Sequence, residues 1–342
     1  MIGLLLLACS LPLVNGAMTF GSMYGLLWSW SPRGRYIYVW AGFSVAAIVF
    51  LWLSWLVIAR TTLDRVTPRQ RLLQRGAAVL SGAAAMYATG PFPSALTHFL
   101  GQAVFTCVLA WLALEVWRAH GIPWGISLPR TAVDRLRDWD ITQLVFTACL
   151  AGGGLSLLMG RLIRWTGVDA PVMKDSQMSA LGIDSVGALF LAVVATVAFE
   201  DVVLVAATTA LLTAVRRPAW QIYTLVCVLE VLLHAYLGLP AIGMLLFAAG
   251  RVWLYGRYGR LVPLMATHLV FDLVNGSLQL LLWVPFLYRF LAALLVVIAA
   301  YWVGHRLRRA AHPAGGESLP QPAIPDGDVP QLPDRRDTVS IQ

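Results

Sequence analysis

Long runs of apolar residues, interrupted by short charged stretches, recur along most of the chain. Each run is long enough to cross the roughly 30 Å hydrocarbon core of a bilayer as an α-helix. The runs between charged breaks therefore predict an all-α fold, a polytopic transmembrane bundle of about ten helices. We expect these helices at 3–30, 37–59, 76–95, 98–117, 141–160, 185–212, 219–237, 239–255, 261–283 and 287–304.

The composition agrees with a lipid environment. Hydrophobic residues make up 59% of the 342 residues and charged residues only 12%, whereas a soluble domain carries about 25% charged residues. The net charge of +8 comes mainly from arginines in short loops, so it predicts membrane orientation and no nucleic-acid partner. The cysteines lie singly in apolar runs without metal-ligand spacing, which is typical of packing residues; they are Cys9, Cys107, Cys149 and Cys227.

Arginines fall mostly in alternate loops of the predicted bundle, and these loops should be cytoplasmic. The acidic loop from Asp169 to Asp184 falls on the opposite side. We therefore expect a multi-pass cell-membrane protein with both termini in the cytoplasm. After Arg309 the sequence becomes rich in Pro, Gly and Ser and loses its apolar character, which predicts a disordered tail.

Ionisable side chains are concentrated in the interiors of three predicted helices. Such a side chain near the bilayer centre costs roughly 2.5–3.5 kcal/mol, so an intramembrane group usually marks a functional site. Taken singly, each residue could merely bond a neighbouring backbone group, but their grouping favours an acid–base or metal site. The residues are Glu200, Asp201, Glu230, His234, His268 and Asp272.

Helical spacing relates these residues to one another. The adjacent carboxylates of Glu200 and Asp201 should point about 100° apart, so only one would aim squarely at a given site. Glu230 precedes His234 by four residues, on the same helix face. His268 and Asp272 have the same separation, so both can face one point between helices.

The stretch at 199–274 resembles the CPBP family of intramembrane proteases, which includes the type II CAAX prenyl endopeptidases. The family pattern is a Glu-Glu pair with an Arg four positions on, then Phe-x-x-x-His, then His-x-x-x-Asn or Asp. The residues that stand at these motifs, in the same order, are Glu200-Asp201, His234 and His268-x-x-x-Asp272.

Three positions depart from the family pattern. Asp201 replaces the second Glu, Val205 stands at the Arg position, and Glu230 stands at the Phe position. The missing Arg removes a cation that would keep the carboxylate pair ionised and oriented. Arg251 is the nearest replacement by sequence. An Arg so close to a helix boundary commonly snorkels to the headgroups, and we expect that role for Arg251, with compensation as the alternative.

The resemblance implies an intramembrane endopeptidase that cleaves a membrane-presented, in some relatives prenylated, peptide through a water activated by Glu200. It implies that His234 and His268 position the water, directly or through a metal, and that Asp201 and Asp272 complete the catalytic set. A Zn²⁺ ion bound by His234, His268 and Glu200 and a metal-free glutamate mechanism both fit these residues. The implied partners are the lipid bilayer and a membrane peptide or protein.

Two other functions fit the same residues. A catalytically impaired CPBP-like protein would bind or escort a membrane partner, and a transporter would use the buried groups as a proton path. A protease needs Glu200, His234 and His268 around one shared point, whereas a relay would string them along a path. On the protease interpretation, the chain divides into N-terminal transmembrane helices and loops over 1–184, a catalytic bundle over 185–304 and a disordered cytoplasmic tail over 305–342.

Overall fold

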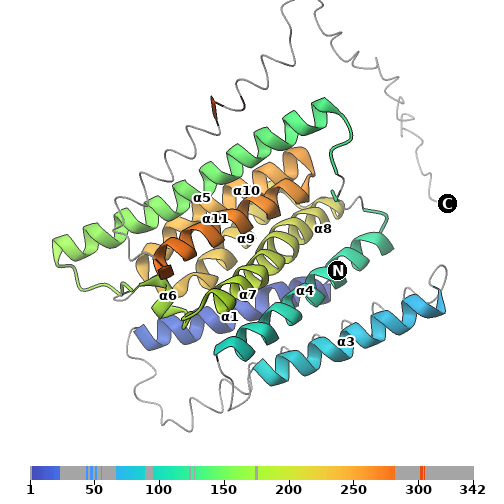
Figure 1. Cartoon of the computed structure of the whole chain (residues 1–342), viewed down its shortest axis with the longest axis horizontal. Coiled ribbons are helices and arrows are strands. Elements are labelled where there is room, and N and C mark those ends of the chain that lie inside the picture. Colours follow the sequence, from blue (N-terminus) through green and yellow to red (C-terminus); the bar gives the residue numbers. More distant parts are fainter. Residues whose placement is uncertain are drawn as a thin grey trace, which may run out of the picture.

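A computed structural model describes residues 2–23, 67–88, 95–122, 125–126, 128–173 and 176–281, together with Ser44, Ala47, Ile48, Leu51, Trp55, Tyr301, Trp302 and Gly304. This part of the chain is all-helical, as predicted, and contains no strand beyond one isolated bridge (Figure 1). The helices are α1 (Ile2–Met23), α3 (Pro68–Ala88), α4 (Ala95–Ala119), α5 (Ala132–Thr166), α6 (Gln177–Ala180), α7 (Val186–Val197), η1 (Ala198–Ala207), α8 (Thr208–Ala214), α9 (Ala219–Leu233), η2 (Ala235–Leu237), η3 (Leu239–Gly243), α10 (Met244–Tyr258) and α11 (Leu261–Leu281).

The membrane character of the fold rests on helix length and apolar composition. Five described helices are long and apolar enough to cross a bilayer, and α9 is a shorter apolar helix. The predicted helices at 37–59 and 287–304 and the predicted tail at 305–342 lie outside the described residues, single positions excepted. The total of about ten helices therefore stays a prediction. The five spans are Leu96–Arg118, Ala132–Thr166, Val186–Ala214, Leu239–Tyr258 and Leu261–Leu280.

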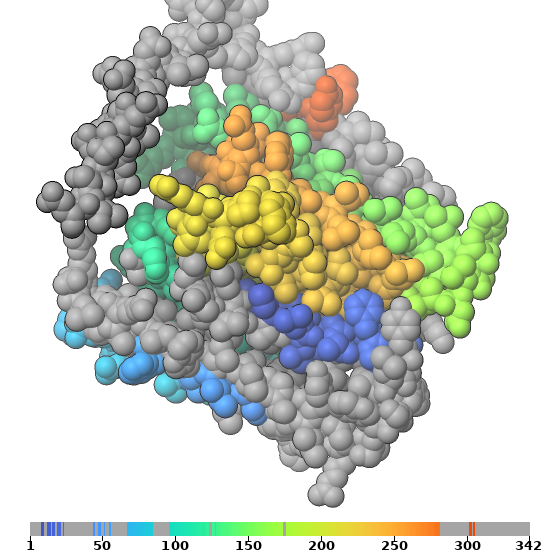
Figure 2. All heavy atoms as spheres, turned by 180° about the vertical axis from the view of Figure 1, so that it is seen from behind, coloured from blue at the N-terminus to red at the C-terminus, as the bar shows by residue number. Residues whose placement is uncertain are grey.

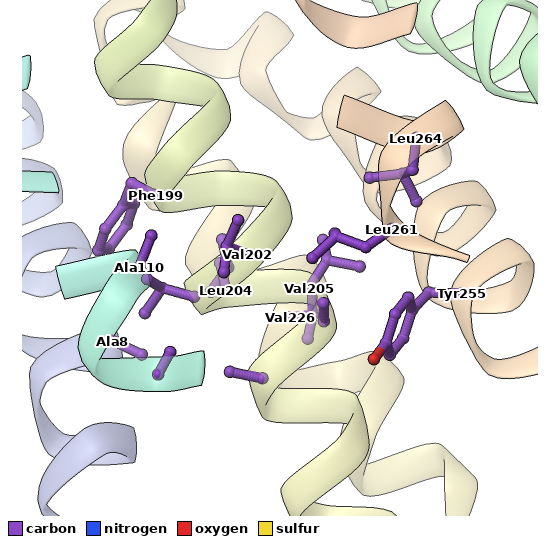
Figure 3. Packing of buried hydrophobic residues seen from close by; sticks show 14 of the residues in the cluster. Ala8, Ala110, Phe199, Val202, Leu204, Val205, Val226, Tyr255, Leu261 and Leu264 are labelled. Atoms are coloured by element: carbon purple, nitrogen blue, oxygen red, sulfur yellow. The ribbon is translucent and has the colours of Figure 1, made fainter. Parts of the chain in front are cut away.

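The centre of the bundle is one continuous helix formed by α7, η1 and α8. Ser185 caps its start by accepting a hydrogen bond from the backbone N–H of Ala188 at 3.3 Å. Every residue of η1 is buried, because α4, α9, α10 and α11 all pack against it. Figure 3 shows the apolar side of this packing, where Val205 lies among Val226, Leu261 and Tyr255. The η1 segment of the central helix is therefore enclosed by protein.

Helix α5 is much longer than the predicted helix at 141–160. A capping box starts it nine residues earlier: Thr131 and Asp134 exchange hydrogen bonds at 3.1 Å. Its 35 residues span about 52 Å, more than the hydrocarbon core requires. Small residues let α10 approach it closely, because a Cβ at Gly152 would lie 2.6 Å from the Cβ of Phe247, and one at Gly250 2.8 Å from that of Ala148.

The spanning helices alternate in direction, which defines two ends of the bundle. At one end, Arg260 of the α10–α11 turn pairs with Asp138 of α5 at 2.6 Å, and Trp117 of α4 stacks on Tyr255 of α10. From behind, α1 lies against the yellow α9 (Figure 2). We call the end marked by Arg260 the arginine end. Its described arginines are Arg69, Arg71, Arg75, Arg118, Arg130, Arg135, Arg137, Arg216, Arg217, Arg257 and Arg260, against Arg161 and Arg164 at the other end.

We predict that the arginine end faces the cytoplasm, because positive residues in short loops are retained there. In a variant without the native cysteines, Ala180→Cys and Arg217→Cys place single thiols at exposed positions of the two ends. A membrane-impermeant maleimide added to intact cells should label Ala180→Cys, and should label Arg217→Cys only after permeabilisation. The opposite labelling pattern would show that the orientation is reversed.

Candidate active site

A fully buried arginine organises the polar residues at the centre of the bundle. Arg251 of α10 has no exposed surface, and its Nη1 lies 2.8 Å from Asp201 Oδ1 and 3.3 Å from Glu200 Oε2. Its Nη2 forms a close ion pair with Glu230 Oε2 at 2.7 Å. The expectation that Arg251 snorkels to a membrane boundary is wrong. Its guanidinium turns inward because three carboxylates from η1 and α9 converge on it.

Phe247 holds this guanidinium from one side. The Cζ atom of Arg251 lies 3.6 Å from the centroid of the Phe247 ring, one helical turn earlier in α10. The same ring meets the imidazole of His268 edge-on, with centroids 5.0 Å apart. Phe247 thus separates the arginine from the histidine and fixes the orientation of both, in the space that Gly152 leaves on α5.

The backbone of the central helix is widened where the carboxylate pair lies. Residues Ala198–Ala207 form a π-helix, whose i→i+5 hydrogen bonds close a wider turn than those of an α-helix. Neighbouring side chains consequently diverge less, and both Glu200 and Asp201 reach Nη1 of Arg251. The expectation that only one carboxylate could aim at a given site is therefore wrong. The other carboxylate oxygens of the pair nonetheless serve different neighbours.

His268 of α11 connects the two carboxylates of the pair to Asp272. Its Nδ1 lies 3.0 Å from Asp201 Oδ2, and its Nε2 lies 3.2 Å from Asp272 Oδ2 and 3.9 Å from Glu200 Oε2. Acidic oxygens therefore face both ring nitrogens. The predicted pairing of His268 with Asp272 at helical spacing is confirmed, and Asp201 supplies a second carboxylate that the sequence pattern did not connect to this ring.

His234 approaches the site from the end of α9. The helix stops at Leu233, short of the predicted 237, and His234 forms its C-cap. The Nδ1 of His234 lies 3.0 Å from the backbone oxygen of Glu230 and 3.6 Å from Glu230 Oε1. One ligand atom each from Glu200, Glu230 and His234 lie within 4.8 Å of one another. Glu200 is thus the residue that both histidines approach, as the convergence prediction requires.

A cavity of about 700 Å³ borders the cluster, whose residues form two layers: those that line the cavity and those behind them. Glu200, His234, His268 and Asp272 line this cavity and form the front layer. Behind them lie residues that do not line it and have no exposed surface: Asp201, Glu230 and Arg251. Asp201, predicted as catalytic, lies behind the cavity lining and contacts the lining residue His268.

The charges of the cluster do not balance without added protons. Three carboxylates contact one guanidinium and a fourth, that of Asp272, contacts His268, so carboxylates outnumber the permanent cation inside an apolar bundle.

The predicted metal-ligand set of His234, His268 and Glu200 fits the arrangement poorly. Carboxylates contact both ring nitrogens of His268. If one of these nitrogens bound a metal through its lone pair, it would carry no proton to donate to its carboxylate. The more compact donor set contains Glu230 in place of His268. Both of its carboxylates already contact the Arg251 guanidinium, at 3.3 and 2.7 Å. A divalent cation there would lie beside a fixed positive charge.

Two features of the site go beyond the sequence pattern. Glu230, predicted as a partner of His234, also pairs with Arg251, and its place at an apolar motif position inside a helix is typical of a buried counter-charge. Tyr236 lines the cavity and accepts a hydrogen bond from Gln177 Nε2 at 2.9 Å. No spacing pattern connects residues so far apart in the chain, so only the fold could have revealed this pair.

Comparison with known proteins adds no relative. No family model, no curated protein and no solved structure matches the chain. The case for function therefore rests on the residues and their geometry.

We predict that Arg251→Gln lowers the free energy of unfolding in detergent by roughly 3–5 kcal/mol, because it strands three buried carboxylates without their cation. Arg257→Gln, on the exposed face of the same helix, is the matched control and should behave like the wild type. Adding Glu230→Gln to Arg251→Gln should recover part of the loss. Equal stability of the Arg251 and Arg257 variants would show that the guanidinium is dispensable.

Proposed function

We propose that the chain is an intramembrane endopeptidase in which Glu200 activates the attacking water. The observation that carries this proposal is the position of Glu200, a 5% exposed carboxylate that lines the cavity and has both histidines around it. Its contacts to Arg251 and His268 both use Oε2. A carboxylate that lines the cavity can accept a proton from a water bound there.

The other front-layer residues supply the remaining parts of a hydrolytic site. Glu200 takes a proton from the water as the water oxygen bonds to the peptide carbonyl carbon. The carbonyl oxygen becomes an oxyanion, and it takes the place of Asp272 as the acceptor for the Nε2–H of His268, which Asp201 orients at the other ring nitrogen. His234 holds the water from the opposite side. The proton then passes from Glu200 to the amine nitrogen as the C–N bond breaks, which leaves a carboxylate and an amine.

The arrangement weakens both alternative functions. A proton relay needs ionisable groups in single file, whereas both histidines and the Arg251 guanidinium all lie close to Glu200 here. The case for an impaired relative rested on Val205 at the motif Arg position. Arg251 supplies a cation to the same carboxylate pair from another helix, so the lost motif residue no longer argues against activity.

Glu200→Gln should lower the cleavage rate of a membrane peptide by roughly 10²–10⁴-fold, because an amide cannot accept the proton from water. The measurement is cleavage of a single-pass peptide library in liposomes by purified protein. Glu115→Gln, a carboxylate that pairs with Arg118 at 3.5 Å outside the cluster, is the control and should keep wild-type activity. Unchanged cleavage by the Glu200 variant, with normal thermal unfolding, would exclude this mechanism.

Metal chelation provides an independent test. Because Arg251 engages both carboxylates of the compact donor set, we predict that 1,10-phenanthroline and EDTA leave cleavage unchanged. Loss of cleavage that added Zn²⁺ restores would instead assign a resident metal to the site.

A further inference from the structure

A short strand edge borders the cavity on the side away from the arginine end. The segment Pro171–Met173, between α5 and α6, meets Leu237–Leu239 through an isolated antiparallel bridge between Val172 and Gly238. The bridge is held by hydrogen bonds from Met173 N–H to Leu237 O at 3.2 Å and from Leu239 N–H to Pro171 O at 2.8 Å. Val172 and Met173 both line the cavity that contains Glu200 and His234.

The hydrogen-bond pattern leaves one backbone edge unused. Because the two bonds flank the Val172–Gly238 pair, the N–H and C=O of Val172 itself point away from Gly238. Neither group forms a hydrogen bond to another residue within the described part of the chain. Gly238 makes the pairing this close, since it adopts a φ of 75° and a Cβ there would overlap the backbone of Pro171.

The unpaired N–H and C=O of Val172 are free to bind a partner that enters the cavity. An extended peptide satisfies such an edge by adding one strand to it, with main-chain hydrogen bonds supplying the affinity. Side-chain amides next to the edge offer further hydrogen bonds, because Gln177 joins Tyr236 at 2.9 Å and Gln279 at 3.4 Å.

We infer that the cavity binds its substrate as an extended peptide strand that pairs with Val172. The part of the peptide that continues past Val172 then runs through the cavity toward Glu200. This inference rests on the proposed peptidase function. A volume of about 700 Å³ is that of a cavity for a ligand of drug size, equivalent to a short peptide segment. The polar edge and the amides favour a peptide over a lipid acyl chain, which cannot form hydrogen bonds. Strand addition also frees the scissile carbonyl from the hydrogen bond it has in a helix.

The principal test removes one hydrogen-bond donor. Val172→Pro deletes the free N–H, whereas the two bonds of the bridge come from Met173 and Leu239 and persist. The probe is a single-pass model peptide of about 20 apolar residues, with a helix-breaking Gly-Pro pair in its outer half and a photoreactive side chain beside that pair. Crosslinking to Glu200→Gln protein reports binding whether or not cleavage occurs.

Val172→Pro in the Glu200→Gln background should reduce peptide crosslinking about tenfold, the effect of one lost hydrogen bond. Leu128→Pro, at a 75% exposed residue in the loop between α4 and α5, controls for the proline itself and should leave crosslinking unchanged. Val172→Ala keeps the N–H and should lose less than Val172→Pro. Equal crosslinking by the Val172→Pro and Leu128→Pro proteins would overturn strand addition.

A cavity-filling pair tests the location of the peptide. Gly154 lines the cavity and a Cβ there meets nothing within 4 Å, so Gly154→Leu should fill the cavity without straining the fold and should block crosslinking. Gly256 has equally open space but does not line the cavity, and Gly256→Leu should have no effect. A phospholipid with a photoreactive acyl chain that labels the cavity and displaces the peptide, regardless of Val172→Pro, would also overturn the inference. Peptide crosslinking without any cleavage by the wild type would instead contradict only the peptidase function.

Discussion

The burial of one guanidinium among carboxylates is the interaction on which the centre of the structure depends. Arg251 joins α10 to η1 and α9 through Glu200, Asp201 and Glu230. In a bundle interior, each of these charges alone would be far more costly than in water, so the four groups are stable there only together. These ion pairs consequently fix α10, η1 and α9 relative to one another next to the cavity.

From this anchor the site is built outward in layers. The back layer does not line the cavity, but its contacts orient the side chains that do. Asp201 contacts His268, and Glu230 contacts His234 through its backbone oxygen and its carboxylate. Glu200 connects the two layers, since it lines the cavity with the front layer and its Oε2 contacts Arg251 of the back layer. Such supporting contacts hold reacting groups in place more firmly than side chains on flexible loops would.

The sequence predicted most of the described helices and some of the contacts within the candidate site. Apolar runs bounded by charges predicted the central helix at 185–212 to within two residues of Val186–Ala214, because the thickness of the bilayer fixes the length of a spanning apolar helix. They underestimated α5, whose first turns are polar and depend on the Thr131 capping box. The π-helix and the inward turn of Arg251 were not predictable, since both arise from contacts between helices that lie far apart in the chain. Local spacing captured the His268–Asp272 pair because both belong to one helix.

The depth of Glu200 exposes its carboxyl group to the transmembrane voltage, which no side chain of a soluble protein experiences. The residue lies at the middle of the helix Val186–Ala214. A proton that reaches it from either aqueous side crosses about half of the transmembrane voltage, which does work of roughly 1 kcal/mol per 100 mV on each charge. The protonation balance of a cluster with an uncompensated carboxylate excess is therefore set by membrane potential as well as by bulk pH. Energising or depolarising the membrane would retune such a site without any ligand.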